Sequence, residues 1–149
     1  MADLNFDDKR IMFTPAMLYI DYINLHFKNY LKKNYENITP RDFTYLANIN
    51  YHQNCSQKDL AEFLFVSESN VAQIIKRLEK NGFVTREIDE KNKSRRILSL
   101  TEKGKETLYT LLKEIYEGEG IFFENYDEED VEKFKRMLYD YTQEVINAY

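Results

Sequence analysis

Apolar residues recur every three to four positions along most of the chain, which is the spacing of one face of an α-helix. This periodicity predicts a mostly helical protein. We expect helices over about 15–33, 40–52 and 67–81, a short helix that starts at residue 56, a helix after residue 101 that is interrupted near 117–120, and a last helix from about 127 or 128 to the C-terminus. Two shorter apolar segments, 83–88 and 96–100, predict strands.

Short motifs mark where several of the predicted helices begin and end. Thr14-Pro15 and Thr39-Pro40 each place an N-cap threonine before a proline in the first helical position. Ser56 and Asp59 have the spacing of a capping box, and Gly82 suits the left-handed position that follows a helix C-terminus. Helix boundaries are therefore predicted by local chemistry as well as by periodicity.

The first and last helices carry more apolar surface than one small domain can cover. The first helix is apolar around most of its circumference, and the last helix has an apolar stripe formed by Val131, Phe134, Leu138, Tyr141, Val145 and Ile146. Because such helices need more partner surface, we expect a homodimer. The predicted organisation is a single domain over 1–149, with a central lobe at about 38–104 and dimerisation helices at about 14–33 and 105–149.

The two predicted strands flank a hydrophilic loop and indicate a β-hairpin with a basic tip. Four of the six residues from Lys91 to Arg96 are basic, and none of the six is acidic. A cationic loop held by two strands suits contact with phosphates or with a DNA minor groove. A charged run by itself is also typical of a solvated surface.

Charge is distributed unevenly along the chain. The formal net charge is −5, but residues 56–105 carry eleven basic and eight acidic groups, whereas residues 106–149 carry four basic and twelve acidic groups. The middle segment is therefore +3 and the C-terminal segment is −8. A polyanion would meet the middle of the chain, and the acidic end would face elsewhere.

Composition narrows the class of protein further. The 149 residues include four glycines and two prolines, too few for the turns of a many-stranded sandwich or barrel. The single cysteine, Cys55, excludes an internal disulfide, and with only two histidines we expect no metal site and no cofactor. No apolar run approaches the length of a membrane span, and residues 1–10 are acidic rather than basic, so we expect a soluble cytoplasmic protein with no membrane partner.

Two short helices joined by a tight polar turn, followed by a hairpin, are the parts of a winged helix-turn-helix. The outer face of the helix over 67–81 carries amide, hydroxyl and basic side chains, which can bind base edges in the major groove. Any helix exposes polar residues, but this face and a basic hairpin together are more specific than either alone. The candidate DNA-binding residues are Ser69, Asn70, Gln73, Lys76, Arg77, Arg86, Lys91, Lys93, Arg95 and Arg96. The predicted fold class is mostly α with a small β-hairpin wing, a winged helix-turn-helix with N- and C-terminal dimerisation helices.

Four motifs between residues 38 and 108 occur together in a characteristic order. They are Leu60-Ala61-x-x-Leu64, Val66-x-x-Ser69-Asn70-Val71, the run from Ile75 through Gly82 to Val84-x-Arg86, and Leu98-Ser99-Leu100-Thr101-Glu102-Lys103-Gly104. This pattern resembles the MarR (multiple antibiotic resistance regulator) family of bacterial and archaeal transcription factors.

The resemblance implies a sequence-specific regulator that binds double-stranded DNA and acts as a repressor. It implies a triangular homodimer on a pseudo-palindromic operator, with the first, fifth and sixth helices intertwined at the dimer interface. The helix that contains Ser69, Asn70 and Gln73 would enter the major groove, and the wing would lie along the minor groove. Release from DNA by a small phenolic or lipophilic anion is also implied.

The wing departs from the family pattern. The family has Asp-x-Arg at the positions occupied here by Asn92-Lys93-Ser94, and the arginines are displaced to Arg95 and Arg96. In the family the aspartate is thought to orient the arginine that enters the minor groove. We therefore hypothesise that Arg95, supported by Lys93, supplies the wing contact, with no unpaired acid left near the phosphate.

Two further features each have two interpretations. Tyr19, Tyr22, His26 and Tyr30 lie on one side of the first helix and form either one wall of a ligand cleft or part of the packed interface. Cys55 precedes an N-cap residue, where a helix N-terminus can favour a thiolate, but family members that sense oxidants carry their cysteine in the first helix. An ordinary, unreactive thiol is the other interpretation.

The sequence contains no glycine-rich phosphate loop, nucleophile elbow or metal-ligand pair, so we do not expect an enzyme. The alternative from another class is a dimeric helical interaction module whose winged domain binds protein rather than DNA. A basic wing tip favours DNA, because winged helices that bind protein usually lack one. Binding to DNA at several salt concentrations separates the two classes.

Overall fold

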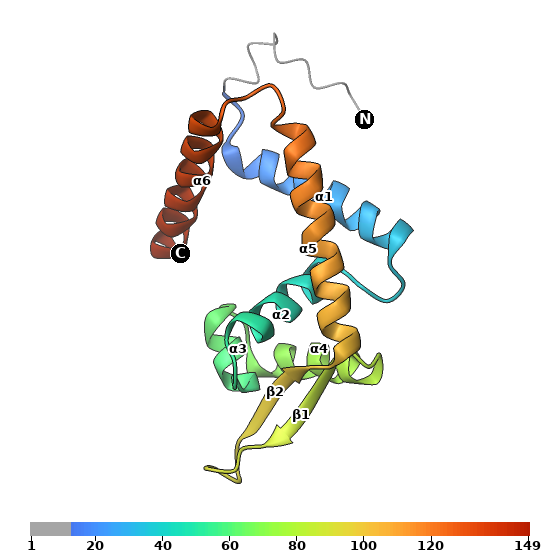
Figure 1. Cartoon of the computed structure of the whole chain (residues 1–149). Helices are drawn as coiled ribbons and strands as arrows, with labels where there is room; N and C mark the ends of the chain where they lie inside the picture. Colours follow the sequence, from blue (N-terminus) through green and yellow to red (C-terminus); the bar gives the residue numbers. More distant parts are fainter. Residues whose placement is uncertain (1–12) are drawn as a thin grey trace. The chain divides into compact units, whose positions relative to one another are not determined.

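The computed structural model describes residues 13–149, which form six α-helices and one two-stranded antiparallel sheet (Figure 1). In chain order the elements are α1 (Ala16–Asn34), α2 (Pro40–Tyr51), α3 (Gln57–Phe63), α4 (Glu68–Lys80), β1 (Val84–Ile88), β2 (Arg96–Leu100), α5 (Glu102–Phe122) and α6 (Glu128–Ala148). The prediction of a mostly helical fold with a small β-hairpin is confirmed. The chain divides into two compact units, and the boundary between Leu108 and Tyr109 falls within α5.

Side-chain caps fix the starts of the helices in the first unit. Thr39 and Ser56 each form a complete capping box, with Asp42 and Asp59 respectively, so the predictions for α2 and α3 are confirmed. The prediction for α1 is wrong by one residue. Pro15 itself is the N-cap, in an extended conformation with ψ 141°, and it provides no side-chain cap.

The core of the first unit lies where α2, α3, α4 and β2 meet. The fully buried residues include Leu46 of α2, Leu60 of α3 and Leu98 of β2. α4 buries Val71, Ile74, Ile75 and Leu78 on a single face, as its periodicity predicts. This packing fixes the orientation of α4, so its opposite face is directed to solvent.

The hairpin is held against the loop that precedes α3. β1 and β2 pair antiparallel with Val84 opposite Leu100 and Ile88 opposite Arg96. Leu98 is buried, and its N–H donates to the carbonyl oxygen of Cys55 at 2.8 Å. The base of the hairpin therefore has a backbone connection to the α2–α3 loop.

Two glycines join α4, the hairpin and α5 tightly. Gly82 follows the C-cap of α4 with φ +77°, a conformation that costs a glycine little. At Gly104 a Cβ would overlap the carbonyl oxygen of Phe83, so only glycine fits there. Thr101 closes the junction, because its hydroxyl donates to Gly82 O at 2.6 Å and accepts from Gly104 N at 3.0 Å.

In the second unit, α5 runs without interruption to Phe122, so the break expected near residues 117–120 is wrong. Glycine in a helix costs about 1 kcal/mol relative to alanine but keeps its N–H donor, so Gly118 and Gly120 weaken the helix without ending it. After α5, the Phe123 ring packs against Phe134 with the ring centroids 5.6 Å apart.

Terminal helices α1 and α6 leave most of their apolar residues exposed in the single chain. Leu31 is the only buried residue of α1, and α6 has none. Large exposed apolar residues are Met17, Leu18, Tyr22, Ile23, Leu25 and Tyr30 on α1, and Phe134, Met137, Leu138, Tyr139 and Ile146 on α6. The apolar pattern of α1 predicts a helix that is buried on more than one side, and the single chain does not bury it in that way. None of the helices in residues 13–149 is both long enough and apolar enough to span a membrane.

Candidate nucleic-acid interface

The solvent-facing side of α4 presents the side chains expected to read DNA. Ser69, Gln73, Lys76 and Arg77 are exposed, and Asn70 is half-buried. The Oδ1 atom of Asn70 is buried without a hydrogen-bond partner in the described part of the chain. The arrangement offers amide and hydroxyl groups for base edges and cations for phosphates.

Arg77 also connects α4 to α2. Its guanidinium donates to Oδ1 of Asp42, a carboxylate that is fully buried. The other oxygen of Asp42 accepts from the N–H and the hydroxyl of Thr39, at 2.8 and 2.9 Å. One carboxylate thus caps α2 and holds an arginine from the outer face of α4, so Arg77 has a structural role in the free protein.

Arg86 of β1 is paired in a similar way at the surface. It donates to Glu79 of α4 at 2.6 Å, and both side chains are more than one third exposed. An exposed ion pair contributes about 0–1 kcal/mol, so a phosphate can replace Glu79 as the partner of Arg86.

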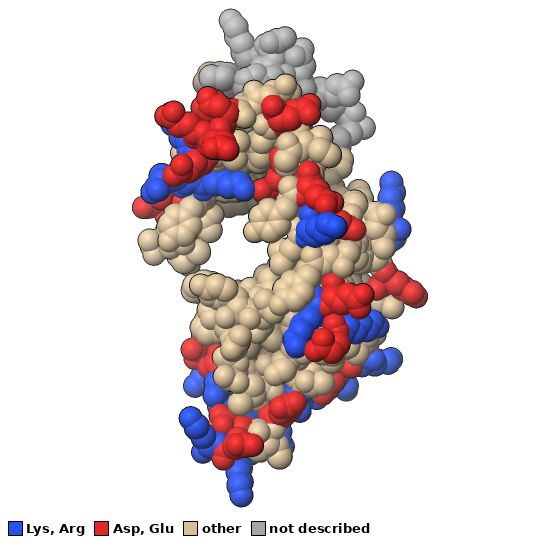
Figure 2. Space-filling view, in the orientation of Figure 1, with Lys and Arg blue, Asp and Glu red and all other residues tan. Residues whose placement is uncertain are grey.

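Three basic side chains of the wing are exposed to solvent. Lys91, Lys93 and Arg96 are exposed, and none of them forms an ion pair with another residue of the range 13–149. Figure 2 shows Lys and Arg side chains, interspersed with Asp and Glu, in the region where Figure 1 draws the hairpin. These cations are available to phosphates.

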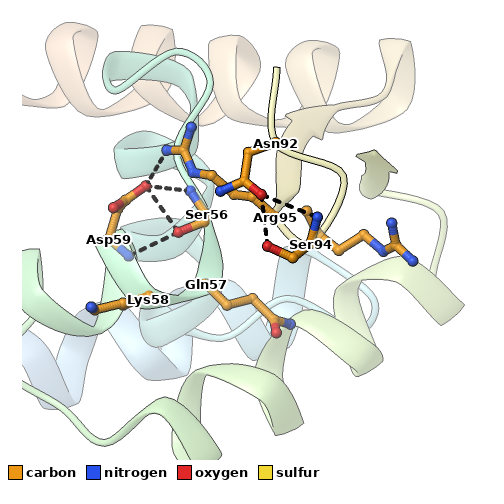
Figure 3. Close-up of a pocket in the computed structure, with 8 residues that line it drawn as sticks. Ser56, Gln57, Lys58, Asp59, Asn92, Ser94 and Arg95 are labelled. Carbon is orange, nitrogen blue, oxygen red and sulfur yellow. Dashed lines mark hydrogen bonds and ion pairs between the residues drawn. The ribbon is translucent and has the colours of Figure 1, made fainter. Parts of the chain in front are cut away.

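Arg95 lies elsewhere than the sequence-based hypothesis supposes. Its Nη2 donates to Asp59 Oδ2 at 2.6 Å (Figure 3) and to the carbonyl oxygen of Asn54 at 3.1 Å, and its Nη1 donates to Asp89 Oδ2 at 3.1 Å. Two acids therefore lie beside this arginine, and both are paired with it. Two carboxylates, from the hairpin and from α3, hold its guanidinium against the protein.

The charges of this cluster shift its pKa values in a consistent way. Burial raises the pKa of Asp59, but hydrogen bonds from Ser56 and the Arg95 guanidinium outweigh it, and the pKa of Asp59 is lowered overall. The Lys91 backbone N–H, followed by the Arg95 side chain, lowers the pKa of Asp89. Hydrogen bonds to Asp59 and Asp89 raise the pKa of Arg95. All three groups are thus stabilised in their charged forms.

An open pocket lies between the start of α3 and the wing, beside this cluster (Figure 3). Its volume is about 390 Å³, and it is lined by Ser56, Gln57, Lys58, Asp59, Asn92, Ser94, Arg95 and Arg96. At its wing side, the Ser94 hydroxyl donates to Asn92 Oδ1 at 2.6 Å. The two residues at the family's Asp and Arg positions therefore bind each other and stabilise the loop.

The candidate ligand-binding residues lie on α1. Tyr22, His26 and Tyr30 are exposed and Tyr19 is half-buried. The rings of Phe27 and Tyr30 are stacked with centroids 6.5 Å apart. Both interpretations of this face, a ligand wall and a packed interface, stay predictions.

Cys55 is buried, and burial together with the nearby Asp59 charge raises its thiol pKa to about 11. The thiol is therefore protonated at neutral pH, which favours the interpretation as an ordinary, unreactive cysteine.

Sequence reasoning identified the basic residues but missed the acids that hold them. The ion pairs are Arg77 with Asp42, Arg86 with Glu79, and Arg95 with both Asp59 and Asp89. A partial signal was present for Asp42 and Asp59, since a capping-box carboxylate can accept further donors. The remaining pairs join residues that only the folded chain brings together.

Comparison with known proteins agrees with the geometry. The sequence profile of the MarR family matches residues 38–95. An HTH-type transcriptional regulator of Bacillus cereus (strain ATCC 10987) is 33% identical over 103 residues, which are 69% of this chain and 66%, just under two thirds, of that protein.

Among solved structures, the crystal structure of MarR has a TM-score of 0.75 at 26% identity, over 90% of this chain and 92% of that one. Streptococcus pneumoniae FabT, solved in complex with DNA, shares the fold with a TM-score of 0.79 at 15% identity, over 89% of this chain and 94% of that one. A matching profile, a regulator of similar sequence and the winged helix-turn-helix architecture lead to one conclusion: the chain belongs to the MarR family.

Proposed function

We propose that this chain is a sequence-specific transcriptional repressor that binds double-stranded DNA as a homodimer. The observation that carries the proposal is the position of two features in one unit: the polar outer face of α4 and the exposed cations of the wing. The fold shared with FabT, a protein solved in complex with DNA, supports the same function.

In this proposal α4 lies in the major groove. Asn70 and Gln73 supply amides that pair with adenine, and Lys76 supplies a cation for guanine or phosphate. Arg77 and Arg86 serve as phosphate contacts only if they exchange their present carboxylate partners.

The wing contact in this proposal comes from Lys91, Lys93 and Arg96. These side chains are exposed and form no ion pair within residues 13–149, so DNA phosphates bind them without competition from an internal acid.

The exposed apolar faces of α1 and α6 support the homodimer. Each helix carries several large apolar residues at the surface of the single chain, which is more than isolated surface residues require. A symmetric dimer buries the same patch on both copies. Two α4 helices about 34 Å apart would then match half-sites one DNA turn apart.

A small phenolic or lipophilic anion would contact the α1 face formed by Tyr19, Tyr22, His26 and Tyr30, and its binding would release the dimer from DNA. The aromatic character of this face supports the choice of ligand class. The proposal includes a cytoplasmic location, because a regulator must reach the DNA that it binds.

The experiment that tests the function is selection of bound sequences from a random DNA duplex pool. We expect enrichment of one pseudo-palindromic sequence whose half-sites are about ten base pairs apart. Selection that enriches no sequence, together with a monomer in analytical ultracentrifugation, would contradict the proposal. Weak binding to every duplex would instead favour the alternative, an interaction module that binds protein.

A further inference from the structure

We propose that Arg95 is a positioning residue that fixes the wing against the start of α3, and that it does not itself contact DNA. The inference rests on the proposed DNA-binding function, and it reassigns one of the residues expected to touch phosphate. It concerns the direction of the wing, which determines whether Lys91, Lys93 and Arg96 reach the DNA backbone.

The first half of the contact closes the tip of the wing. The N–H of Asp89 donates to the carbonyl oxygen of Arg95 at 3.0 Å, and the N–H of Arg95 donates to that of Asn92 at 2.8 Å. The side chain of Arg95 then bonds Asp89 Oδ2 at 3.1 Å. Backbone and side-chain bonds thus join the same two residues, one on each side of the loop.

The second half of the contact joins the loop to α3, which is distant in sequence. Nη2 of Arg95 donates to Asp59 Oδ2 at 2.6 Å and to Asn54 O at 3.1 Å. That Asp59 oxygen also accepts from the N–H and hydroxyl of Ser56, at 2.7 and 2.9 Å. The anchor is therefore the capped start of α3, and Figure 3 shows the contacts of Asp59 with Ser56 and Arg95.

Charge argues against a direct phosphate contact by Arg95. Its guanidinium is shared between two carboxylates, Asp59 and Asp89, so this group of three has a net charge of −1. To bind phosphate, Arg95 would have to leave two acids that would then face the DNA unpaired. Lys93, two residues away, forms no ion pair within the described range and makes the contact without that cost.

Geometry requires arginine rather than any cation. Three acceptors lie around one planar guanidinium: a carboxylate of the wing, a carboxylate of α3 and the carbonyl oxygen of Asn54. Lysine has a single ammonium nitrogen on a flexible chain and cannot reproduce this fork. A wing fixed before binding avoids the cost of ordering it on DNA, and ordering one flexible side chain or loop segment weakens affinity by up to about tenfold.

The test compares Arg95→Gln and Arg95→Lys with Lys93→Gln, a matched variant in the same loop that loses one charge. Hydrogen–deuterium exchange on the free full-length protein is the first measurement. We expect both Arg95 variants to exchange faster at the amides of 89–98, and Lys93→Gln to match the wild type. This measurement needs no DNA, so it tests whether Arg95 fixes the wing against α3 even if the proposed function fails.

DNA affinity on the selected duplex, measured across salt concentrations, is the second measurement. We expect both Arg95 variants to lose about tenfold in affinity with an unchanged salt slope, and Lys93→Gln to reduce the slope by about 0.9, the loss of one phosphate contact. Arg95→Lys at wild-type affinity, or a reduced slope for Arg95→Gln, would overturn the proposal. If Arg95→Gln does not fold, Asp89→Asn removes one anchor and carries the same expectations. A wild-type protein that binds no duplex contradicts the proposed function instead.

Discussion

Arg77, on the outer face of α4, forms an ion pair with the fully buried carboxylate of Asp42 at the start of α2. The helix proposed to read DNA is therefore tied to its scaffold by a residue of the same face that would meet DNA. Removing Arg77 has two expected consequences, one for stability and one for binding.

Replacing Arg77 with methionine leaves Asp42 buried and without its cation. Loss of one partner of a fully buried pair costs about 3–5 kcal/mol. Arg77 is itself 43% exposed, and water can reach the site, so we expect a loss of about 1–3 kcal/mol in the free energy of unfolding by urea.

The matched control is Arg86→Met, which removes the exposed pair with Glu79 and should cost no more than about 1 kcal/mol. Equal losses for the two variants would show that the burial of Asp42 does not determine the energy of its pair.

Phe65 occupies a strained position in the turn between α3 and α4. Its φ is +53° and its side chain is 76% exposed, so an L residue bears the left-handed strain and gains little from packing. We expect Phe65→Gly to raise the free energy of unfolding by about 1 kcal/mol.

Asn37→Gly is the comparison for Phe65, because Asn37 has φ 63° and asparagine tolerates this region. It should change stability by much less. A destabilised Phe65→Gly would mean that the aromatic ring makes contacts that outweigh its backbone strain.

Gly104 and Gly120 should respond to alanine with opposite signs. A Cβ at Gly104 would overlap the carbonyl oxygen of Phe83, whereas nothing lies within 4 Å of a Cβ at Gly120 in the α5 helix. We expect Gly104→Ala to lower the melting temperature and Gly120→Ala to stabilise by about 0.5–1 kcal/mol. If both alanine variants were stabilised, the close approach of α5 to Phe83 would be refuted.

Acid should weaken the contribution of Arg95 to stability. The folded-state pKa values of Asp59 and Asp89 are lowered, so their stabilisation is complete above the unfolded value of about 3.9 and is lost as the pH falls through the folded values. We expect the gap in urea midpoint between the wild type and Arg95→Gln to be constant from about pH 7 to 5 and to shrink below about pH 4.

For Lys93→Gln, the difference in urea midpoint from the wild type should not shrink below about pH 4. The reason is that Lys93 pairs with no carboxylate among residues 13–149. A gap for Arg95→Gln that is equally large at pH 3 and pH 7 would contradict the ion pairs.

Features that depend on neighbours in sequence were predictable, and features that depend on distant partners were not. The N-cap at Thr39, the capping box at Ser56 and the glycine after α4 follow from residues at most a few positions apart. The position of Arg95 depends on Asp59, 36 residues earlier, and no local pattern indicates that pair. The prediction of a break in α5 was wrong, because it treated Gly118 and Gly120 as residues that end a helix, whereas glycine only weakens one.

The central claim is that α4 reads a DNA sequence, and the most direct measurement is the ratio of affinities for the selected duplex and a scrambled duplex at one salt concentration. We predict a ratio of about a thousand or more for the wild type. Gln73→Ala should lower the ratio, because it weakens binding to the selected duplex alone. Lys93→Gln should weaken binding to both duplexes equally and so leave the ratio unchanged. Equal wild-type affinities for the two duplexes, or a ratio unaffected by Gln73→Ala and other changes on the outer face of α4, would contradict the account.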